Sequence, residues 1–424
     1  MTERKSVIIT FKPKDQRRDR HTDKLEIVRK ALTRGTRAHF LDATSMAKGG
    51  RTSIEDQIVG YDVDHYDAPI VTAQLTQREI QRLQEDDNVA KVEDDGPCHA
   101  AGFGPYRHLR LREPGDCPQA EEIPDNIKQV DADQAWGIST GAGIKVAILD
   151  TGIDYNHPDL AANYKGGVSY VAGNASPMDD QGHGTHCAGI IAAARNGHGL
   201  VGIAPDASLY AVKVLDAQAT GRFSWSIAGI DWCTNNGINI INMSLGCEAA
   251  PSALELICNY AWSKKGILIV AGAGNQSDGD PVPPWQSNVE YPAKYYRDVI
   301  GVSSIDASNK IAPNSARGPE VKLCAPGVDI RSTLLDGKCG IGSGTSVASP
   351  HVAGVAALAW KAHEAAGIDN EGVWNLLAHT ADNLGRPGRD SLYGYGRVNA
   401  LAAVSATLPV PIMPKGKCCC EDAA

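Results

Sequence analysis

Ile144-Lys-Val-Ala-Ile-Leu149 is an almost continuous apolar run, and it ends at the carboxylate of Asp150. A strand that is apolar on both faces is typical of a parallel sheet covered by helices on both sides. Similar runs follow at Leu209–Val214, Ile238–Met243, Ile267–Ala271 and Val299–Val302. Segments of helical pattern fit between them, for instance Cys187–Ala194, Ser226–Thr234 and Ala253–Ser263. This alternation predicts an α/β domain with a doubly wound, mainly parallel sheet and functional side chains at the carboxyl ends of its strands.

A smaller unit precedes this domain. Its sequence predicts strands at 6–12, 57–63, 70–75 and 88–93 and helices at 23–32 and after Thr76, where Thr76-Gln-Arg-Glu79 has the pattern of a capping box. The order β-α-β-β-α-β is that of a small ferredoxin-like α+β domain. Because its core is modest, we expect its stability to depend on a partner surface.

Changes in composition suggest four parts of the chain. Residues 1–96 form the ferredoxin-like unit, and residues 97–122, rich in Gly, Pro, Arg and Cys without periodicity, form a linker. Residues 123–406 form the main domain. Residues 407–424 are a proline-punctuated tail that we expect to be flexible.

The overall composition limits the possible partners. Hydrophobic residues make up 42% and charged residues 21% of 424 residues, which indicates a packed globular protein. No run of about 18 apolar residues occurs, so no membrane span is predicted. The 41 Lys and Arg residues against 50 Asp and Glu give a net charge of −9, whereas nucleic-acid binders are normally basic. We therefore expect a monomer with neither a membrane nor a nucleic acid as partner.

The eleven cysteines leave several interpretations open. They include no CxxC pair, which argues against a zinc module. Cys98 and Cys117 lie in the linker and either bridge it or stay free. Cys418, Cys419 and Cys420 in the tail bind a soft metal, form mixed disulfides, or have no role beyond the tail itself.

Three motifs together point to nucleophilic catalysis. Asp150-Thr-Gly follows the buried strand, Gly182-His183-Gly-Thr-His186 lies where a loop enters a helix, and Gly344-Thr-Ser346-Val-Ala begins an apolar helix. A serine hydroxyl is a weak nucleophile until an imidazole accepts its proton, and a carboxylate orients that imidazole. A helix N-terminus also directs backbone N–H groups at the negative oxygen that develops on attack.

With these motifs in this order, residues 123–405 resemble the subtilisin-like serine proteases. The resemblance implies that Asp150 orients, that His183 is the general base and acid, and that Ser346 is the nucleophile. It also implies that Asn275, in Val270-Ala-Gly-Ala-Gly274-Asn275, stabilises the oxyanion. His186 and His351 are expected to be packed structural histidines.

The resemblance further implies an extended polypeptide substrate that pairs with two strands flanking a cleft. The matching positions are Ala219, Thr220, Gly221, Ser244, Leu245 and Gly246, with Phe223 and Leu245 lining a hydrophobic subsite. Gly272, Ala273 and Gly274 are likewise expected to bind the substrate. Glu290 falls at the base of the first specificity pocket, where its carboxylate favours Lys or Arg at the cleaved position, unless the side chain points to solvent.

A structural Ca²⁺ ion is implied as well. Its oxygen ligands come from separated segments, as suits this ion. They are Glu121, Asp159 in the His-Pro-Asp turn, and the loop residues Ala194, Asn196, His198 and Leu200. The alternative is that these acids are solvated turn residues.

The ferredoxin-like unit resembles the family's propeptide, a folding chaperone and intramolecular inhibitor, so we expect a zymogen. The cut falls after Ala100, Arg112 or Ala120. The N-terminus shows no apolar segment of a secretory signal, which favours the cytoplasm, whereas a propeptide and a calcium site suit an exported protein.

Two rival interpretations fit less well. A serine esterase of the α/β-hydrolase type has the order Ser, Asp, His and a Gly-x-Ser-x-Gly nucleophile, whereas Ser346 comes last and lacks that motif. An inactive binding protein of the same fold does not explain why Asp150, His183, Ser346 and Asn275 are all present.

Overall fold

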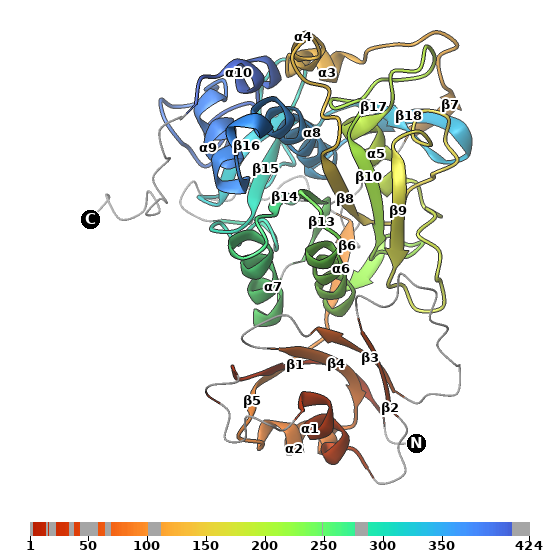
Figure 1. Ribbon diagram of the computed structural model, residues 1–424, viewed down its shortest axis with the longest axis vertical. Helices are drawn as coiled ribbons and strands as arrows, with labels where there is room; N and C mark the ends of the chain where they lie inside the picture. The colour runs from red at the N-terminus through yellow and green to blue at the C-terminus, as the bar shows by residue number, and fades with distance from the viewer. Residues whose placement is uncertain are drawn as a thin grey trace.

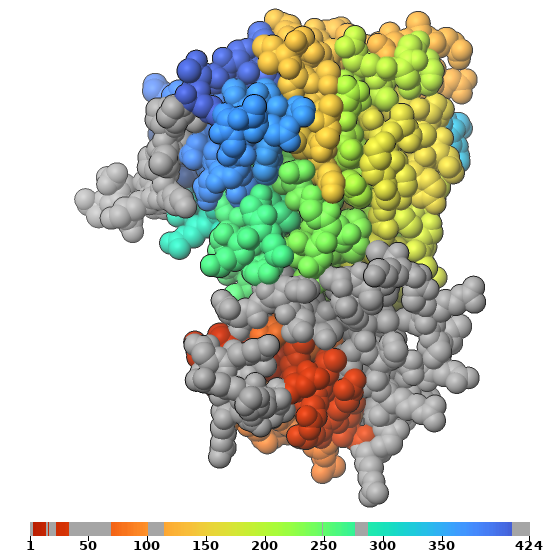
Figure 2. All heavy atoms as spheres, in the orientation of Figure 1, coloured from red at the N-terminus to blue at the C-terminus, as the bar shows by residue number. Residues whose placement is uncertain are grey.

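The computed structural model describes residues 3–13, 16, 23–33, 38–42, 58–63, 69–100, 112–247, 249–275 and 287–408. A large domain and a smaller N-terminal unit lie along the long axis of the molecule (Figures 1 and 2). The tail from residue 409, with Cys418, Cys419 and Cys420, lies outside the described residues, as does most of the loop 276–289 before Glu290. No helix in the described ranges is long and apolar enough to cross a membrane.

The large domain is built on a parallel sheet of seven strands in the order β16-β15-β14-β12-β8-β10-β9. The predicted doubly wound α/β fold is confirmed. The strands are β8 Lys145–Asp150, β9 Tyr164–Ser169, β10 Ser208–Lys213, β12 Ile240–Met243, β14 Leu268–Gly272, β15 Ile300–Ile305 and β16 Val321–Pro326. Only the two edge strands were not predicted, because Tyr164-Lys-Gly-Gly and Val321-Lys-Leu-Cys interrupt their apolar residues.

Successive residues of the central strands point to opposite faces, and each face has its own helices. Val146 and Ile148 belong to one buried cluster with side chains of α5 (His183–Ala192) and α8 (Thr345–His363). The same cluster includes side chains of α9 (Asn370–Thr380) and α10 (Ala400–Ser405). Ala147 and Leu149 pack with α6 (Phe223–Asn235) and α7 (Ser252–Ser263). The short helices α3 (Asp125–Gln129) and α4 (Ala132–Ala135) join the first group. The near-continuous apolar strands are therefore buried on both sides, as their sequence predicted.

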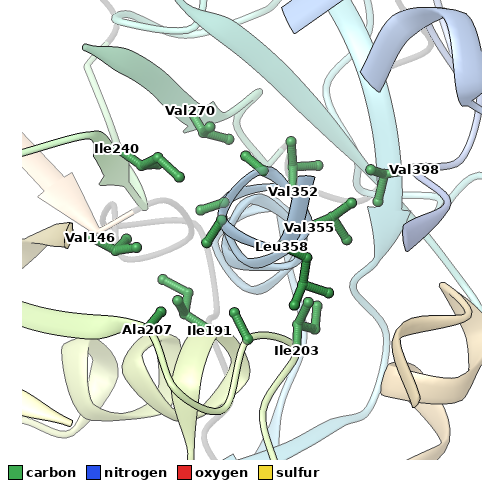
Figure 3. Close-up of a cluster of buried hydrophobic side chains, with 14 of the residues drawn as sticks. Val146, Ile191, Ile203, Ala207, Ile240, Val270, Val352, Val355, Leu358 and Val398 are labelled. Atoms are coloured by element: carbon green, nitrogen blue, oxygen red, sulfur yellow. The ribbon is translucent and has the colours of Figure 1, made fainter. Parts of the chain in front are cut away.

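Helix α8 is the centre of the larger core. Every residue from Thr345 to Trp360 is buried, as expected for a helix that is apolar all round. Figure 3 shows Val352, Val355 and Leu358 on this helix among side chains from the sheet and from α5. This packing holds the first turn of α8 at the carboxyl edge of the sheet.

Helix α5 begins four residues earlier than its apolar pattern indicated. It starts at His183, after Gly182 in a left-handed conformation with φ 108°. All ten helical residues are buried, including the polar His183 and Thr185. The hydrophobic pattern therefore misses the first turn of α5, because the buried side chains there include polar ones.

The N-terminal unit contains the predicted β-α-β-β-α-β order plus one strand. It consists of β1 Lys5–Phe11, α1 Lys24–Ala31, β2 Ala38–Asp42, β3 Ile58–Val63, β4 Ile70–Leu75, α2 Gln77–Gln84 and β5 Val89–Asp94. The sheet order is β2-β3-β4-β1-β5, so the unpredicted β2 is an edge strand parallel to β3. The predicted capping box of Thr76 and Glu79 is present.

The small unit shares part of its core with the large domain. Val7, Ile9 and Phe11 belong to its own cluster, whereas Ile8 and Ile70 are buried together with α6 and α7 side chains. Two carboxylates strengthen this contact. Asp95 accepts hydrogen bonds from the Ser224 N–H and hydroxyl at 2.9 and 2.7 Å.

Glu93 accepts hydrogen bonds from Ser252 in the first turn of α7, at 3.1 Å from the N–H and at 2.6 Å from the hydroxyl. Burial acts to raise the pKa of Glu93, but hydrogen bonds from Lys91 and Ser252 outweigh it and lower the pKa. The first turns of α6 and α7 are thus capped by the N-terminal unit.

The segment predicted as a linker contains two strands. β6 (Pro97–Ala100) lies between β11 (Thr220–Arg222) and β13 (Leu245–Gly246). β7 (Arg112–Asp116) pairs with β18 (Lys338–Gly342), which pairs with β17 (Ile330–Thr333). Both strands are too short to show periodicity, and their partners are more than 100 residues away, so composition alone gave no signal.

Two disulfides connect the linker to the large domain. Cys98 pairs with Cys247 and Cys117 with Cys339, with Cα–Cα distances of 4.9 and 5.0 Å. The expectation that Cys98 and Cys117 bridge the linker or stay free is therefore wrong. The remaining described cysteines, Cys187, Cys233, Cys258 and Cys324, are buried thiols.

Candidate active site

Asp150 and His183 meet at the carboxyl end of β8. Asp150 is the last residue of that strand and His183 the first of α5. The distance between His183 Nδ1 and Asp150 Oδ1 is 2.7 Å, and both side chains are fully buried. Gly184 permits this contact, because a Cβ there would lie 2.1 Å from the carbonyl oxygen of Gly152. The carboxylate thus orients the imidazole from its Nδ1 side.

Ser346 lies in the same neighbourhood, in the first turn of α8. Cys187 lies close to both Ser346 and the Asp150–His183 pair. Its Sγ is 3.5 Å from the Ser346 carbonyl oxygen. That Sγ also lies within 4.8 Å of ligand atoms of Asp150 and His183. The buried Ser346 Oγ has no hydrogen-bond partner among the described residues. Its hydroxyl is available to a reacting group.

Cys187 itself is a packing residue. Burial, and then the negative charge of Asp150, raise the pKa of its thiol well above the usual value. A protonated thiol is a poor nucleophile and a poor metal ligand.

Asn275 follows β14 and holds the start of α8. Its Oδ1 accepts the Thr345 N–H at 2.9 Å. Its Nδ2 is buried and has no partner within the described part of the chain. Gly344 is in a conformation suited to glycine, with φ 143°, and a Cβ there would lie 3.1 Å from Asn275 Nδ2 and 3.4 Å from Ser346 Oγ. A buried donor without a partner is costly, and here it borders the serine hydroxyl, where an anionic oxygen would satisfy it.

The two segments predicted to bind substrate flank a strand of the protein itself. In β11, Thr220 and Gly221 pair with His99 and Cys98 of β6. In β13, Leu245 and Gly246 pair with Ala100 and His99. Ala219 precedes β11 and accepts the Ala100 N–H at 3.0 Å. The two segments thus hold residues 97–100 between them in extended form.

Phe223 and Leu245, the residues predicted to line a hydrophobic subsite, belong to one apolar cluster with Cys98. The Ser244 side chain contacts α8 instead. Its hydroxyl donates to the Ser346 carbonyl oxygen at 2.6 Å and lies 3.1 Å from Ser349 Oγ, so its side chain supports the first turn of α8.

Glu290 is buried between two of the predicted substrate segments. The residue as a whole is only 7% exposed, so the alternative that its side chain points to solvent is wrong. A Cβ at Gly246 would lie 1.8 Å from its Oε2, and one at Gly274 would lie 2.8 Å from its Cδ. Its N–H donates to Ala273, and a Cβ at Gly272 would lie 2.9 Å from the Thr345 carbonyl oxygen. The three glycines leave room for the carboxylate and for α8.

The six predicted calcium ligands converge around Asp159. Its carboxylate accepts the Leu200 N–H at 2.9 Å and an Asn196 side-chain hydrogen at 3.3 Å. The His198 ring lies 3.2 Å from it. Glu121 Oε2 accepts the Gly197 N–H at 2.9 Å.

Alternate carbonyls of the loop 194–200 have different surroundings. The carbonyl oxygens of Gly197 and Gly199 accept hydrogen bonds from Glu121 and Glu122. No such bond to the carbonyl oxygens of Ala194, His198 and Leu200 occurs within the described ranges. Two carboxylates, an amide side chain and three carbonyls fit a hard cation such as Ca²⁺.

A second group with metal-ligand chemistry adjoins this loop. It consists of Cys117, His157, Asp159 and Cys339. The two cysteines are paired as a disulfide, and both nitrogens of His157 have backbone partners, Lys338 and Asp159. The group is therefore structural in this state.

Sequence reasoning missed three contributors to the site. Thr345 holds Asn275 and Gly274, Cys247 binds Cys98, and β6 lies between β11 and β13. Only the position of Thr345 beside the proposed nucleophile gave a usable signal, since the other contacts join segments that are distant in the chain.

His186 and His351 are buried and bound to backbone, as expected for structural histidines. His186 Nε2 lies 3.1 Å from the Ile330 carbonyl oxygen. His351 Nδ1 donates to Val347 at 2.8 Å, and its Nε2 accepts from Asn126 at 2.9 Å. Burial lowers the pKa of His186 to about 3 and that of His351 to about 4.

Acid should destabilise the fold through these two histidines. Between pH 6.5, the pKa of the unfolded histidine, and the lowered native pKa, the unfolded chain binds protons that the native state does not bind. The free energy of unfolding therefore falls as the pH falls through this range. Urea unfolding of a Ser346→Ala protein at pH 7 and pH 5 measures this loss. Adding His351→Gln should remove about 2 kcal/mol of the drop. An equal drop with and without His351→Gln would contradict this assignment.

Comparison with known proteins agrees with the geometry. The model of the subtilase family matches residues 141–396. Subtilisin E of Bacillus subtilis is 40% identical over 333 residues, which cover 78% of this chain and 79% of the relative. A thermostable alkaline protease of Halalkalibacterium halodurans is 38% identical over 345 residues, 80% and 85% of the two chains. A subtilisin of Bacillus pumilus is 42% identical over 286 residues, 67% and 99%.

Proposed function

Since this chain belongs to the subtilase family and is a serine endopeptidase, we propose that Asp150, His183 and Ser346 are its catalytic triad. The observation that carries this assignment is the 2.7 Å contact between a fully buried carboxylate and His183 Nδ1. A carboxylate on Nδ1 directs the basic lone pair of the imidazole to Nε2. From there His183 accepts the proton of Ser346 as Oγ attacks the peptide carbonyl.

The reaction proceeds in two halves. Attack produces a tetrahedral oxyanion, which collapses to an acyl-enzyme as His183 donates the proton to the leaving amine. Water then attacks the acyl-enzyme ester, and His183 again accepts a proton and donates it, now to Ser346 Oγ. Asp150 stays ionised and stabilises the imidazolium in both halves.

Asn275 stabilises the oxyanion. Its Oδ1 is fixed by the Thr345 N–H, which holds Nδ2 beside Ser346. The N-terminal end of α8 adds positive backbone potential at the same place. Because Nδ2 is already in position, little reorganisation is needed when charge develops.

A fluorophosphonate probe tests the triad directly, in protein freed of any bound propeptide. The probe should label the wild type at Ser346 and should not label Ser346→Ala, whereas Ser349→Ala, a buried serine of the same helix, should still be labelled. Asn275→Ala should lower kcat by roughly 10²- to 10³-fold, a range that comes from a subtilisin. Labelling of Ser346→Ala would refute the assignment.

The substrate is a polypeptide bound in extended form between β11 and β13. The strand β6 supports this mode, because it already pairs with both segments. Backbone pairing gives affinity with little dependence on sequence, and side-chain pockets give preference.

Glu290 gives a preference for Lys or Arg at the cleaved position. Its carboxylate is buried against Gly246 and Gly274, next to the oxyanion segment. A cationic side chain entering this pocket would form a charge-assisted pair shielded from water.

Glu290→Gln keeps the shape of the side chain and removes its charge. We expect the ratio of kcat/KM for Lys and Arg peptides over Leu and Tyr peptides to fall at least ~10-fold. Glu290→Gly should reduce it further. An unchanged ratio in Glu290→Gln would show that the carboxylate does not read the substrate.

The loop around Asp159 binds a structural Ca²⁺ ion. Glu121, Asp159 and Asn196 supply side-chain oxygens, and Ala194, His198 and Leu200 supply carbonyls. The ion would join the segment before α3 to the loop after α5.

Calcium should raise thermal stability. In a Ser346→Ala protein, Ca²⁺ at 100 times its Kd should add roughly 3 kcal/mol, which EDTA removes and Mg²⁺ does not restore. Asp159→Asn should abolish the response, and the exposed Glu364→Gln should retain it. A melting temperature insensitive to EDTA would favour solvated turn acids.

The N-terminal unit is an inhibitory propeptide. The 333-residue match to Subtilisin E is longer than the chain from residue 123 to its end, so the similarity includes part of the preceding segment. Of the three predicted processing positions, Ala100 ends the strand in the cleft, Arg112 lies in β7, and Ala120 adjoins the calcium loop. We therefore propose that the cut follows Ala100, the last residue of β6.

A further inference from the structure

The disulfide between Cys98 and Cys247 joins the two parts that zymogen activation must separate. Cys98 is the second residue of β6, and Cys247 directly follows β13. Both are buried, with exposed fractions of 0% and 3%. We propose that this bridge keeps the inhibitory strand covalently bound in the cleft after processing, so that the protease becomes active only when a thiol reductant opens the bridge.

The inference rests on the proposed function and on the placement of β6. This strand pairs with β11 on one side and β13 on the other, where a substrate peptide would lie. Cys98 and Ala100 point into the protein, with Cys98 in the apolar cluster of Phe223 and Leu245. As long as the bridge is intact, no substrate can use this part of the cleft.

A cut on the carboxyl side of β6 turns one chain into two but leaves the bridge unbroken. The noncovalent contacts of the N-terminal unit, such as Asp95 with Ser224, can exchange with solvent. The bridge prevents the released unit from diffusing away, because its effective concentration at the cleft stays high at any dilution. Processing alone therefore gives a latent two-chain form.

The opening step is a thiol–disulfide exchange. A thiolate attacks one sulfur of the bridge, forms a mixed disulfide and releases the other cysteine. A second thiol resolves the mixed disulfide. Two thiols are oxidised to one disulfide, and Cys98 and Cys247 each end as a thiol. Since both sulfurs are buried, we expect exchange to need local opening of β6 and to be slow.

The second disulfide provides an internal control. Cys117 and Cys339 both lie on the carboxyl side of the proposed cut, so their bridge joins two parts of one product. Its reduction changes local stability but releases no inhibitor. Of the two disulfides among the described residues, the Cys98–Cys247 bridge alone crosses the proposed processing site.

Wild-type protein prepared without reductant and allowed to process itself tests the proposal. On a non-reducing gel it should run as one species of full mass, and on a reducing gel as two. Fluorophosphonate labelling of Ser346 should rise by roughly 10²-fold after dithiothreitol. Cys98→Ser and Cys247→Ser should label fully without dithiothreitol. The double variant Cys117→Ser, Cys339→Ser should still require it.

Other results would overturn the proposal. Full labelling of the wild type without reductant, with the bridge intact on the gel, would show that the bridge does not lock the cleft. A chain that stays in one piece after reduction would show that no two-chain form exists for the bridge to hold together. If Cys98→Ser is folded by circular dichroism and cut, yet no form is labelled with or without reductant, the protease assignment itself fails.

Discussion

The hydrogen bond between Asp150 and His183 is the interaction on which the site depends. It forms only because a strand buried on both faces ends beside the first turn of α5. Burial strengthens the contact and excludes water from it. The same sheet edge receives the start of α8, where Asn275 and Ser346 meet around Gly344. Catalytic geometry is thus a consequence of how two helices dock on one edge of the sheet.

The N-terminal unit and the large domain form one folded system. Ile8 and Ile70 of the small sheet are buried with α6 and α7, and Glu93 and Asp95 cap those helices. The small unit therefore buries part of its sheet against the large domain. In the zymogen that we propose, a disulfide fixes the inhibitory strand in the substrate position, so release rather than cleavage is the controlling step.

Local sequence predicted most of the architecture because each signal was contained in one segment. The five central strands are apolar on both faces, and Thr76-Gln-Arg-Glu79 is a complete cap. The edge strands β9 and β16, the short strands β6 and β7, and the first turn of α5 gave no periodic signal. In these segments glycine, proline or buried polar side chains replace the apolar pattern, and pairing with distant residues decides the structure.

The amino-acid sequence by itself determined the fold class and the order of the acid, imidazole and hydroxyl motifs, because residue type and spacing carry this information. Only the tertiary structure decided that Glu290 is buried, that Asn275 Nδ2 lacks a partner among the described residues, and that Cys98 binds Cys247 directly after β13. Those properties depend on contacts between segments that are far apart in the chain, which no local pattern encodes.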